Sequence, residues 1–176
     1  MKNHLLISIL GIDRPALIND LSRTILDAGC TVLDCRLVTF GDELGGILHV
    51  KGNWNTLVKL EKQLERFEST PDLTFAIKRI ENQRPVVSLL PYAIEVIAPE
   101  NPALLSELSQ FFVRRTVSIE EMSIRSYSAP YTGTAMCAVS MTLGLPANTH
   151  IALLREEFMD FCDEFNFDAI LEPIKG

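Results

Sequence analysis

The chain contains one motif twice, and the two copies lie 87 residues apart. The segment LISILGIDRPALINDLS at positions 6–22 aligns without a gap to AIEVIAPENPALLSELS at positions 93–109. The residues that recur are Pro15, Ala16, Leu17, Leu21 and Ser22, as Pro102, Ala103, Leu104, Leu108 and Ser109, and the acidic Asp13 and Asp20, as Glu100 and Glu107. A period of this length is too long for a solenoid repeat and suits a small domain. We therefore predict two copies of one fold.

The pattern of apolar residues assigns the same order of elements to both copies. Alternating or continuous apolar residues predict strands, and apolar residues spaced three and four apart predict helices. A proline at the first helical turn and a glycine after the last turn mark helix boundaries. The first copy is predicted to have strand 4–10, helix 16–28, strands 31–40 and 44–50, helix 54–67 and strand 73–80. The second is predicted to have strand 92–98, helix 102–115, strands 117–128 and 134–143, helix 150–165 and strand 167–172.

This βαββαβ order is typical of a ferredoxin-like α+β sandwich, in which two helices cover one face of a four-stranded antiparallel sheet. We predict one domain over residues 1–82, a second over residues 92–176, and a linker over residues 83–91 within ENQRPVVSLLP. The strand 31–40 is expected to be half-buried, because alternate residues along a strand face opposite sides of the sheet. The face of each sheet without helices would otherwise expose apolar strand residues. We therefore expect association of the two copies or of two chains, as a homo-oligomer such as a dimer.

The charge of the chain, −7 in total, falls entirely on its second half. Residues 1–84 carry 11 basic and 11 acidic side chains, whereas residues 85–176 carry 5 basic and 12 acidic side chains. Direct binding to nucleic acid is disfavoured, because it depends on clustered Lys and Arg that neutralise phosphates. The acidic second half favours solubility or a basic partner surface.

The sequence contains no signal for a membrane-spanning segment, a metal site or a cofactor site. No apolar run approaches the roughly 18 residues that a membrane-spanning helix needs. The N-terminal MKNHLLISILGIDRP has no small-residue cleavage site, so we interpret it as a strand and expect a cytoplasmic protein. No Cys-x-x-Cys or Cys–His metal spacing occurs, so we expect no metal, no cofactor and mostly buried thiols at Cys30, Cys35, Cys137 and Cys162.

The loop GIDRPAL, between the first strand and the first helix, resembles the Asp-x-Pro-Gly loop of ACT domains, which are small-molecule-sensing modules of amino-acid metabolism. The stretches AGCTVLDCRLVTFGDEL and KGNWNTLVKLE are similar to tandem-ACT transcription regulators. The resemblance covers nearly the whole chain, and it is stronger in the first copy than in the second, where APENPAL keeps the proline but not the arginine.

The resemblance implies a regulator and not an enzyme. Such proteins lack a DNA-binding domain and act as repressors by holding a LysR-type activator protein, with glycine as the releasing signal. Both copies here depart from the family by having Pro-Ala in place of Pro-Gly. The added Cβ crowds the space where the backbone approaches a small ligand, and this bears on the affinity or identity of the ligand.

We predict an amino-acid site at the loop before the first helix of each copy. The N–H groups at a helix N-terminus suit a carboxylate, whereas an acidic or amide side chain suits an ammonium group. The arginine of the loop can clamp a carboxylate or pair across an interface. The same residues also fit ordinary capping and solvated-loop roles. The candidate ligand-binding residues are Asp13, Arg14, Ala16, Leu17, Ile18 and Asn19 in the first copy and Glu100, Asn101, Ala103 and Leu104 in the second.

Other functions of this fold agree less well with the sequence. An acylphosphatase-like enzyme needs a glycine-rich phosphate cradle after the first strand, and GIDRPAL contains one glycine. No catalytic triad or pair of acid–base carboxylates is evident. A metal chaperone needs Cys-x-x-Cys in the first loop, and an RNA-recognition fold needs exposed aromatic residues with basic flanks. The nearest alternative is a tandem-ACT regulator of another pathway, which senses a different amino acid or none.

Overall fold

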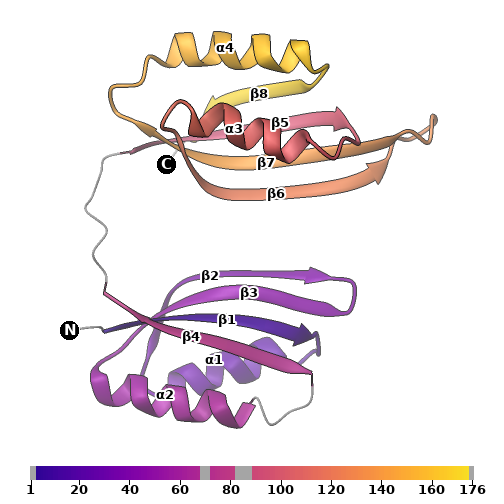
Figure 1. Ribbon diagram of the computed structural model, residues 1–176. Helices are drawn as coiled ribbons and strands as arrows, with labels where there is room; N and C mark the ends of the chain where they lie inside the picture. The colour runs from indigo at the N-terminus through magenta and orange to yellow at the C-terminus, as the bar shows by residue number, and fades with distance from the viewer. Residues whose placement is uncertain (1–2, 68–71, 82–88, 175–176) are drawn as a thin grey trace. The chain divides into compact units, whose positions relative to one another are not determined.

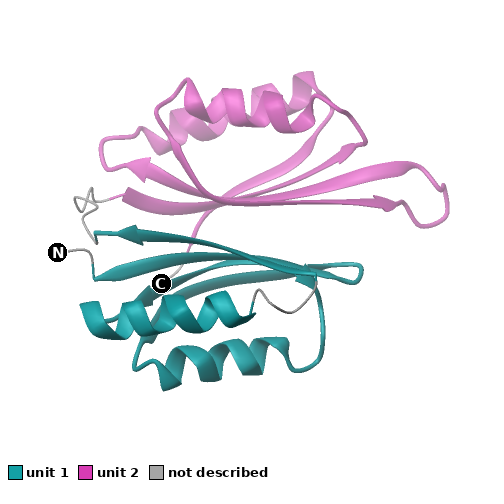
Figure 2. Cartoon of the chain, turned by 60° about the horizontal axis from the view of Figure 1, so that its bottom comes forward, with its two compact units in different colours: residues 1–84 teal, residues 85–176 magenta. Residues whose placement is uncertain are grey.

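The structure, a computed structural model, describes residues 3–67, 72–81 and 89–174. The chain divides into two compact units, residues 1–84 and 85–176, and each has its own hydrophobic core. Figure 1 shows the same arrangement in both units, with helices packed on one face of a four-stranded sheet, and Figure 2 colours the units separately. The predicted α+β class and the two ferredoxin-like copies are confirmed.

The two units have the same topology. The first contains β1 (His4–Ile12), α1 (Leu17–Asp27), β2 (Thr31–Phe40), β3 (Glu43–Lys51), α2 (Trp54–Phe67) and β4 (Leu73–Ile80). The second contains β5 (Leu89–Pro99), α3 (Leu104–Val113), β6 (Ser118–Ser128), β7 (Ala135–Pro146), α4 (Ile151–Glu164) and β8 (Asp168–Pro173). The antiparallel sheets have the orders β2-β3-β1-β4 and β6-β7-β5-β8. The first strand of each unit is thus internal, and it leads directly to the loop of the candidate site.

Alternate residues of the internal strands build the cores, as the period of two along a strand requires. In β1, Leu5, Ile7 and Ile9 are 0–1% exposed and face the helices. The buried stripe of α1 that meets them consists of Leu17, Leu21 and Ile25, and that of α2 consists of Leu57, Leu60 and Leu64. These stripes fix α1 and α2 side by side over the sheet.

Each predicted element occurs among the described residues, and the difference that affects the predicted linker is at β5. This strand begins at Leu89, three residues before the predicted strand 92–98. The earlier start is possible because β7 extends to Pro146 and pairs with Leu89. Residues 89–91 therefore belong to a strand and not to the predicted linker, and the rest of that linker, 83–88, lies outside the described residues.

Strand β2 is more exposed than the predicted half-buried strand. Of its ten residues Leu37 alone is half-buried, while Val38 and Phe40 are 48% and 69% exposed. The strand lies at the edge of its sheet, next to β3 only. The alternating sequence predicted the strand correctly but could not show that the strand lies at the edge.

None of the described helices has the length and apolarity of a membrane-spanning helix.

Helix α1 ends in a Schellman motif, which satisfies its last carbonyl groups. The Gly29 N–H donates to the Leu26 oxygen (2.8 Å), and the Cys30 N–H donates to the Ile25 oxygen (3.1 Å). Gly29 has a φ of +81°, the left-handed conformation that glycine adopts without a Cβ clash. The predicted helix stop at this glycine is confirmed.

The second copy builds the same motif with a β-branched residue. The Thr116 N–H donates to the Val113 oxygen (3.1 Å), and the Val117 N–H donates to the Phe112 oxygen (3.1 Å). Thr116 stands 87 residues after Gly29 and has a φ of +60°. The left-handed region costs a residue with a Cβ about 1–2 kcal/mol.

We expect Thr116→Gly to raise the free energy of unfolding by about 0.5–1 kcal/mol, because relief of the left-handed strain exceeds the added chain entropy of glycine. Urea denaturation of the variant measures this change. The reciprocal variant Gly29→Thr serves as the control and is expected to lower the stability. An unchanged or lower stability of Thr116→Gly would contradict the prediction.

A histidine pair links the two central strands of the first sheet. The His4 Nδ1 lies 2.9 Å from the His49 Nε2, and His4 is 7% exposed. Burial first, and then the neighbouring His49 and Lys51, lower the pKa of His4 below its ordinary value near 6.5. Lys51 stands opposite His4 in the β1–β3 register, and Ile80 stands opposite it in β4.

The stability of the first unit is expected to fall as the pH decreases below about 6.5, the ordinary pKa of histidine. The unfolded chain then binds a proton at His4 more readily than the folded protein does, because the folded pKa is lower. Urea midpoints on both sides of this pH measure the effect, and His4→Gln should reduce the difference between them. An equal pH dependence in the variant and the natural protein would exclude His4 as the cause.

Candidate functional site

Backbone hydrogen bonds hold the loop at residues 13–16 against the β2–β3 turn. The Asp13 N–H donates to the Asp42 oxygen (2.8 Å). In the second copy the Glu100 N–H makes the equivalent bond to the Ala135 oxygen (2.9 Å). The loop before each first helix therefore has a fixed position relative to its own sheet.

Some of the amides predicted to bind a carboxylate already have partners within the loop. The Leu17 N–H donates to the Arg14 oxygen (2.9 Å), and the Leu104 N–H donates to the Asn101 oxygen (3.1 Å). The Asn101 Oδ1 accepts a bond from the Ala103 N–H (2.9 Å), in the turn before α3, whose N-cap residue is Ala103. A ligand carboxylate at these amides would have to compete with these bonds.

The other predicted residues lie at the protein surface. Ala16 is the N-cap of α1, and its carbonyl oxygen accepts a hydrogen bond from the Asp20 N–H (2.8 Å). The predicted residues that are exposed are Asp13, Arg14, Ala16, Ile18, Asn19, Glu100 and Ala103.

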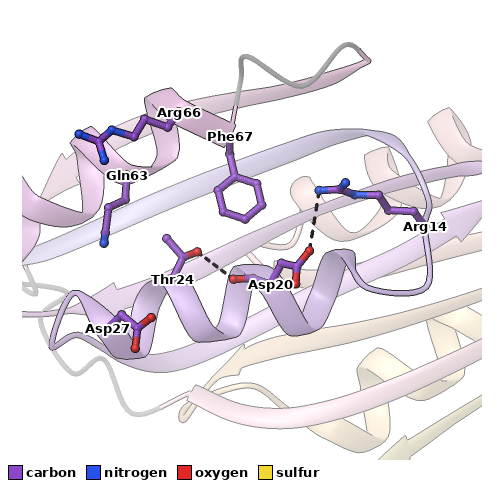
Figure 3. A pocket seen from close by; sticks show the side chains of 7 residues that line it. All are labelled: Arg14, Asp20, Thr24, Asp27, Gln63, Arg66 and Phe67. Atoms are coloured by element: carbon purple, nitrogen blue, oxygen red, sulfur yellow. Dashed lines mark hydrogen bonds and ion pairs between the residues drawn. The ribbon is translucent and has the colours of Figure 1, made fainter.

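A groove of about 400 Å³ lies between α1 and α2, beside the first loop (Figure 3). Arg14 extends from the loop over the first turn of α1, where its Nη2 lies 3.9 Å from Oδ2 of Asp20. Side chains of α2 face these residues from the other side of the groove. The lining residues are Arg14, Asp20, Thr24, Asp27, Gln63, Arg66 and Phe67.

Gln63 provides a buried acceptor in this groove. Its Oε1 is shielded from solvent, and within the described part of the chain it has no hydrogen-bond partner. A buried polar atom without a partner costs about 1–3 kcal/mol.

The charges of the groove are of both signs and sum to zero. Two guanidinium groups, of Arg14 and Arg66, line it together with two carboxylates, of Asp20 and Asp27. Guanidinium groups bind carboxylates by charge-assisted hydrogen bonds, and carboxylates bind ammonium groups. This set of groups is complementary to a free amino acid, which carries both.

Sequence reasoning found one residue of this groove, Arg14, and missed the other six. The repeat contained one signal for a second groove residue, since the acidic Asp20 recurs in the second copy as Glu107. The groove residues of α2 lie 49–53 positions after Arg14 in the sequence. Only the packing of α1 on α2 brings them near the loop, so no local pattern could indicate them.

The second unit has a groove at the equivalent place, between α3 and α4, with a volume of about 530 Å³. Its composition differs, since aromatic and acidic side chains predominate. Its lining residues are Glu107, Gln110, Phe111, Arg114, Arg115, Glu157, Asp160, Phe161, Glu164 and Phe165. The two copies have therefore diverged at matching sites.

The described residues contain no group of three or more His, Cys, Asp or Glu side chains that could hold a metal ion. Three of the four cysteines are buried, as expected, whereas Cys35 is exposed because it belongs to the edge strand β2. Burial, with a smaller effect of Asp163, raises the pKa of Cys162 to about 12. A thiol with that pKa is not a nucleophile near neutral pH.

Comparisons with known proteins agree with this architecture. Residues 3–78 match the sequence model of the ACT domain. The chain is 27% identical over 174 residues to the glycine cleavage system transcriptional repressor of Escherichia coli (strain K12), covering 98% of this chain and 91% of that protein. The repressor of the same name from Shigella flexneri matches with the same identity and coverage.

Two crystal structures share the fold over the full length. One is of a candidate glycine cleavage system transcriptional repressor, with a TM-score of 0.74, 23% identity and coverage of 98% of both chains. The other is of an unknown protein from Galdieria sulphuraria, with a TM-score of 0.77, 18% identity and coverage of 98% of this chain and 99% of that one. Both sequence relatives are named as transcriptional repressors. The first unit therefore matches the ACT domain over residues 3–78, and the chain as a whole is similar to the glycine cleavage system transcriptional repressors.

Proposed function

We propose that the protein is an amino-acid-responsive transcriptional regulator that acts through contact with a LysR-type activator, without binding DNA itself. Its similarity to named transcriptional repressors over nearly the whole chain supports the regulatory role. Its net charge of −7 disfavours direct contact with DNA. The observation that carries the amino-acid response is the groove between α1 and α2, whose charges match those of an amino acid.

The proposed ligand is glycine, held by groups on three segments of the first unit. Arg14 on the loop binds the carboxylate, and Asp20 on α1 binds the ammonium group. Gln63 on α2 lines the same groove and is a further proposed contact. The adjacent loop residues Asp13 and Ala16 remain proposed contacts.

The response follows from the position of the groove. A ligand that contacts the loop, α1 and α2 together favours the arrangement of these elements in which all three contacts form. An activator that binds another arrangement more tightly is then released, because the two binding events are coupled.

We also propose that the protein forms a homo-oligomer. The exposed edge strands β2 and β6 support this, because each offers unpaired backbone groups to a strand of another chain.

A thermal-shift screen against the twenty amino acids tests the proposal. A ligand at 100 times its dissociation constant adds about 2.7 kcal/mol to the stability and raises the unfolding midpoint. A shift with glycine supports the proposed ligand, and a shift with another amino acid alone assigns the protein to another pathway. The absence of any shift would contradict the amino-acid response, and co-purification with a LysR-type activator tests the partner separately.

We expect Arg14→Ala and Asp20→Asn each to weaken amino-acid binding by about tenfold or more, because a hydrogen bond to a charged group contributes about 1.5–3 kcal/mol. Isothermal titration calorimetry gives the dissociation constants. The matched control is Arg23→Ala, since Arg23 is an exposed arginine of α1 that does not line the groove. Unchanged affinity in the two groove variants would locate the ligand elsewhere.

A further inference from the structure

The equivalent helices α2 and α4 carry opposite charge, although they occupy the same place in their units. Helix α2 contains three basic and two acidic residues, whereas α4 contains one basic and five acidic residues. The acidic residues of α4 are Glu156, Glu157, Asp160, Asp163 and Glu164. The groove of the second unit therefore has a negative border that the first groove lacks.

Aromatic rings form the floor and one edge of this second groove. The ring centroid of Phe161 lies 4.9 Å from that of Phe111 and 5.0 Å from that of Phe165. Phe111 is 6% exposed, Phe161 is half-buried, and Phe165 is 37% exposed. The rings thus run from the protein interior to the surface along one side of the groove.

One guanidinium group already occupies part of this groove. The Cζ of Arg115 lies 3.7 Å from the ring centroid of Phe111, and its Nε donates to the Glu157 Oε2 (2.6 Å). Its Nη1 also donates to the backbone oxygen of Phe111 (2.9 Å). The groove therefore binds arginine by stacking on a ring and pairing with a carboxylate, which are the two favourable contacts of a guanidinium.

The same combination recurs further along α4 without an arginine. Asp160 and Glu164 line the groove beside Phe161 and Phe165. Among the described residues, no Lys, Arg or His forms an ion pair with Asp160, Glu164 or Glu107. These three carboxylates offer sites for cations from outside the chain.

We propose that the groove between α3 and α4 is a docking surface for an arginine-rich segment of a partner protein. This inference rests on the proposed function, which requires protein contact, and it identifies the contact surface. The partner's guanidinium groups stack on Phe161 and Phe165 and pair with Asp160 and Glu164, as Arg115 does with Phe111 and Glu157. In this proposal the first groove binds an amino acid and the second groove binds the partner protein.

The charge of the groove selects this class of partner. Four carboxylates and two guanidinium groups line it, so it carries a net charge of −2. A nucleic acid or another anion is repelled, whereas a basic segment is attracted and oriented by the surrounding acidic unit. Arginine is favoured over lysine, because the planar guanidinium stacks on aromatic rings.

The test uses the full chain and a fluorescein-labelled helical peptide with arginines one helical turn apart. Fluorescence anisotropy measures its binding, which is expected to weaken as the salt concentration rises. The double variant Asp160→Lys with Glu164→Lys is expected to weaken binding by about tenfold or more. Phe165→Ala is expected to weaken it severalfold without a change of net charge.

The matched control is Glu156→Lys with Asp163→Lys, which makes the same change of charge on the same helix outside the groove. Urea denaturation confirms that each variant is folded. An equal loss of binding in both double variants would overturn the proposal, since it would show a general attraction to the acidic unit. No binding by the natural protein would also overturn it. This experiment contains no amino acid and no activator. Failure of the peptide to bind would therefore overturn only the docking surface, and the amino-acid response is tested separately by the thermal-shift screen.

Discussion

Replacing Gly11 with alanine is expected to lower the free energy of unfolding of the first unit by about 2–3 kcal/mol, as overpacking in a rigid site does. A Cβ on Gly11 would lie 2.1 Å from the backbone oxygen of Asp72 and 2.8 Å from the Cα of Leu73. Both atoms belong to the backbone at the start of β4, so they cannot move aside as a flexible side chain could. The Ile12 N–H also donates to the Asp72 oxygen (3.1 Å), and this bond would be strained.

Urea denaturation of Gly11→Ala measures the effect, and Gly45→Ala is its control. Gly45 lies on the neighbouring strand β3, and a Cβ there would meet only the Leu10 Cδ1 at an ordinary 3.8 Å. The same substitution is therefore expected to change the stability by less than about 1 kcal/mol at Gly45. Similar losses at both positions would show that a general effect of the substitution, and not the contact with β4, explains the result.

The two copies show why alanine is excluded at one site and accepted at the other. The second copy has Ala98 in the place of Gly11, and Ala98 is fully buried. The pairing of β5 with β8 ends at Ile97 and Asp168, whereas β1 continues to pair with β4 as far as Gly11 and Leu73. The glycine is thus needed where a neighbouring backbone approaches the first strand.

The sequence was sufficient for the fold because the signals for the fold are local. Leu17, Leu21 and Ile25 define one face of α1 within three turns, and Gly29 defines its end. Such patterns need no knowledge of distant residues. The repeat also predicted the two-domain organisation, because the same order of elements occurring twice supports the assignment in each copy.

The candidate site could be predicted only in part, because it depends on contacts between distant segments. Arg14 was identified from the loop motif, but its groove also requires Gln63 and Arg66 from α2. Local reasoning also assigned ligand contacts to the amides of Ala103 and Leu104, for which Asn101 already supplies acceptors. The exposure of β2 was missed for the same reason, since only the strand order places it at an edge.

Phe158→Ala is expected to lower the free energy of unfolding of the second unit by about 3–5 kcal/mol, the usual cost of removing a buried phenylalanine. Phe158 is fully buried beneath the groove of the second unit. Its ring centroid lies 5.4 Å from that of Phe111 and 5.3 Å from that of Phe112. Its removal leaves a cavity that these rings cannot fill without leaving their own contacts.

The control for Phe158→Ala is Phe165→Ala, which removes the same side chain at the surface end of the same aromatic cluster. Because Phe165 is 37% exposed, its loss is expected to cost about 1 kcal/mol, and urea denaturation distinguishes the two values. Equal losses would mean that the cluster is one cooperative unit in which exposure does not matter. A folded Phe165→Ala protein is also what the peptide-binding test needs, since weaker binding by a stable variant can then be attributed to the lost ring.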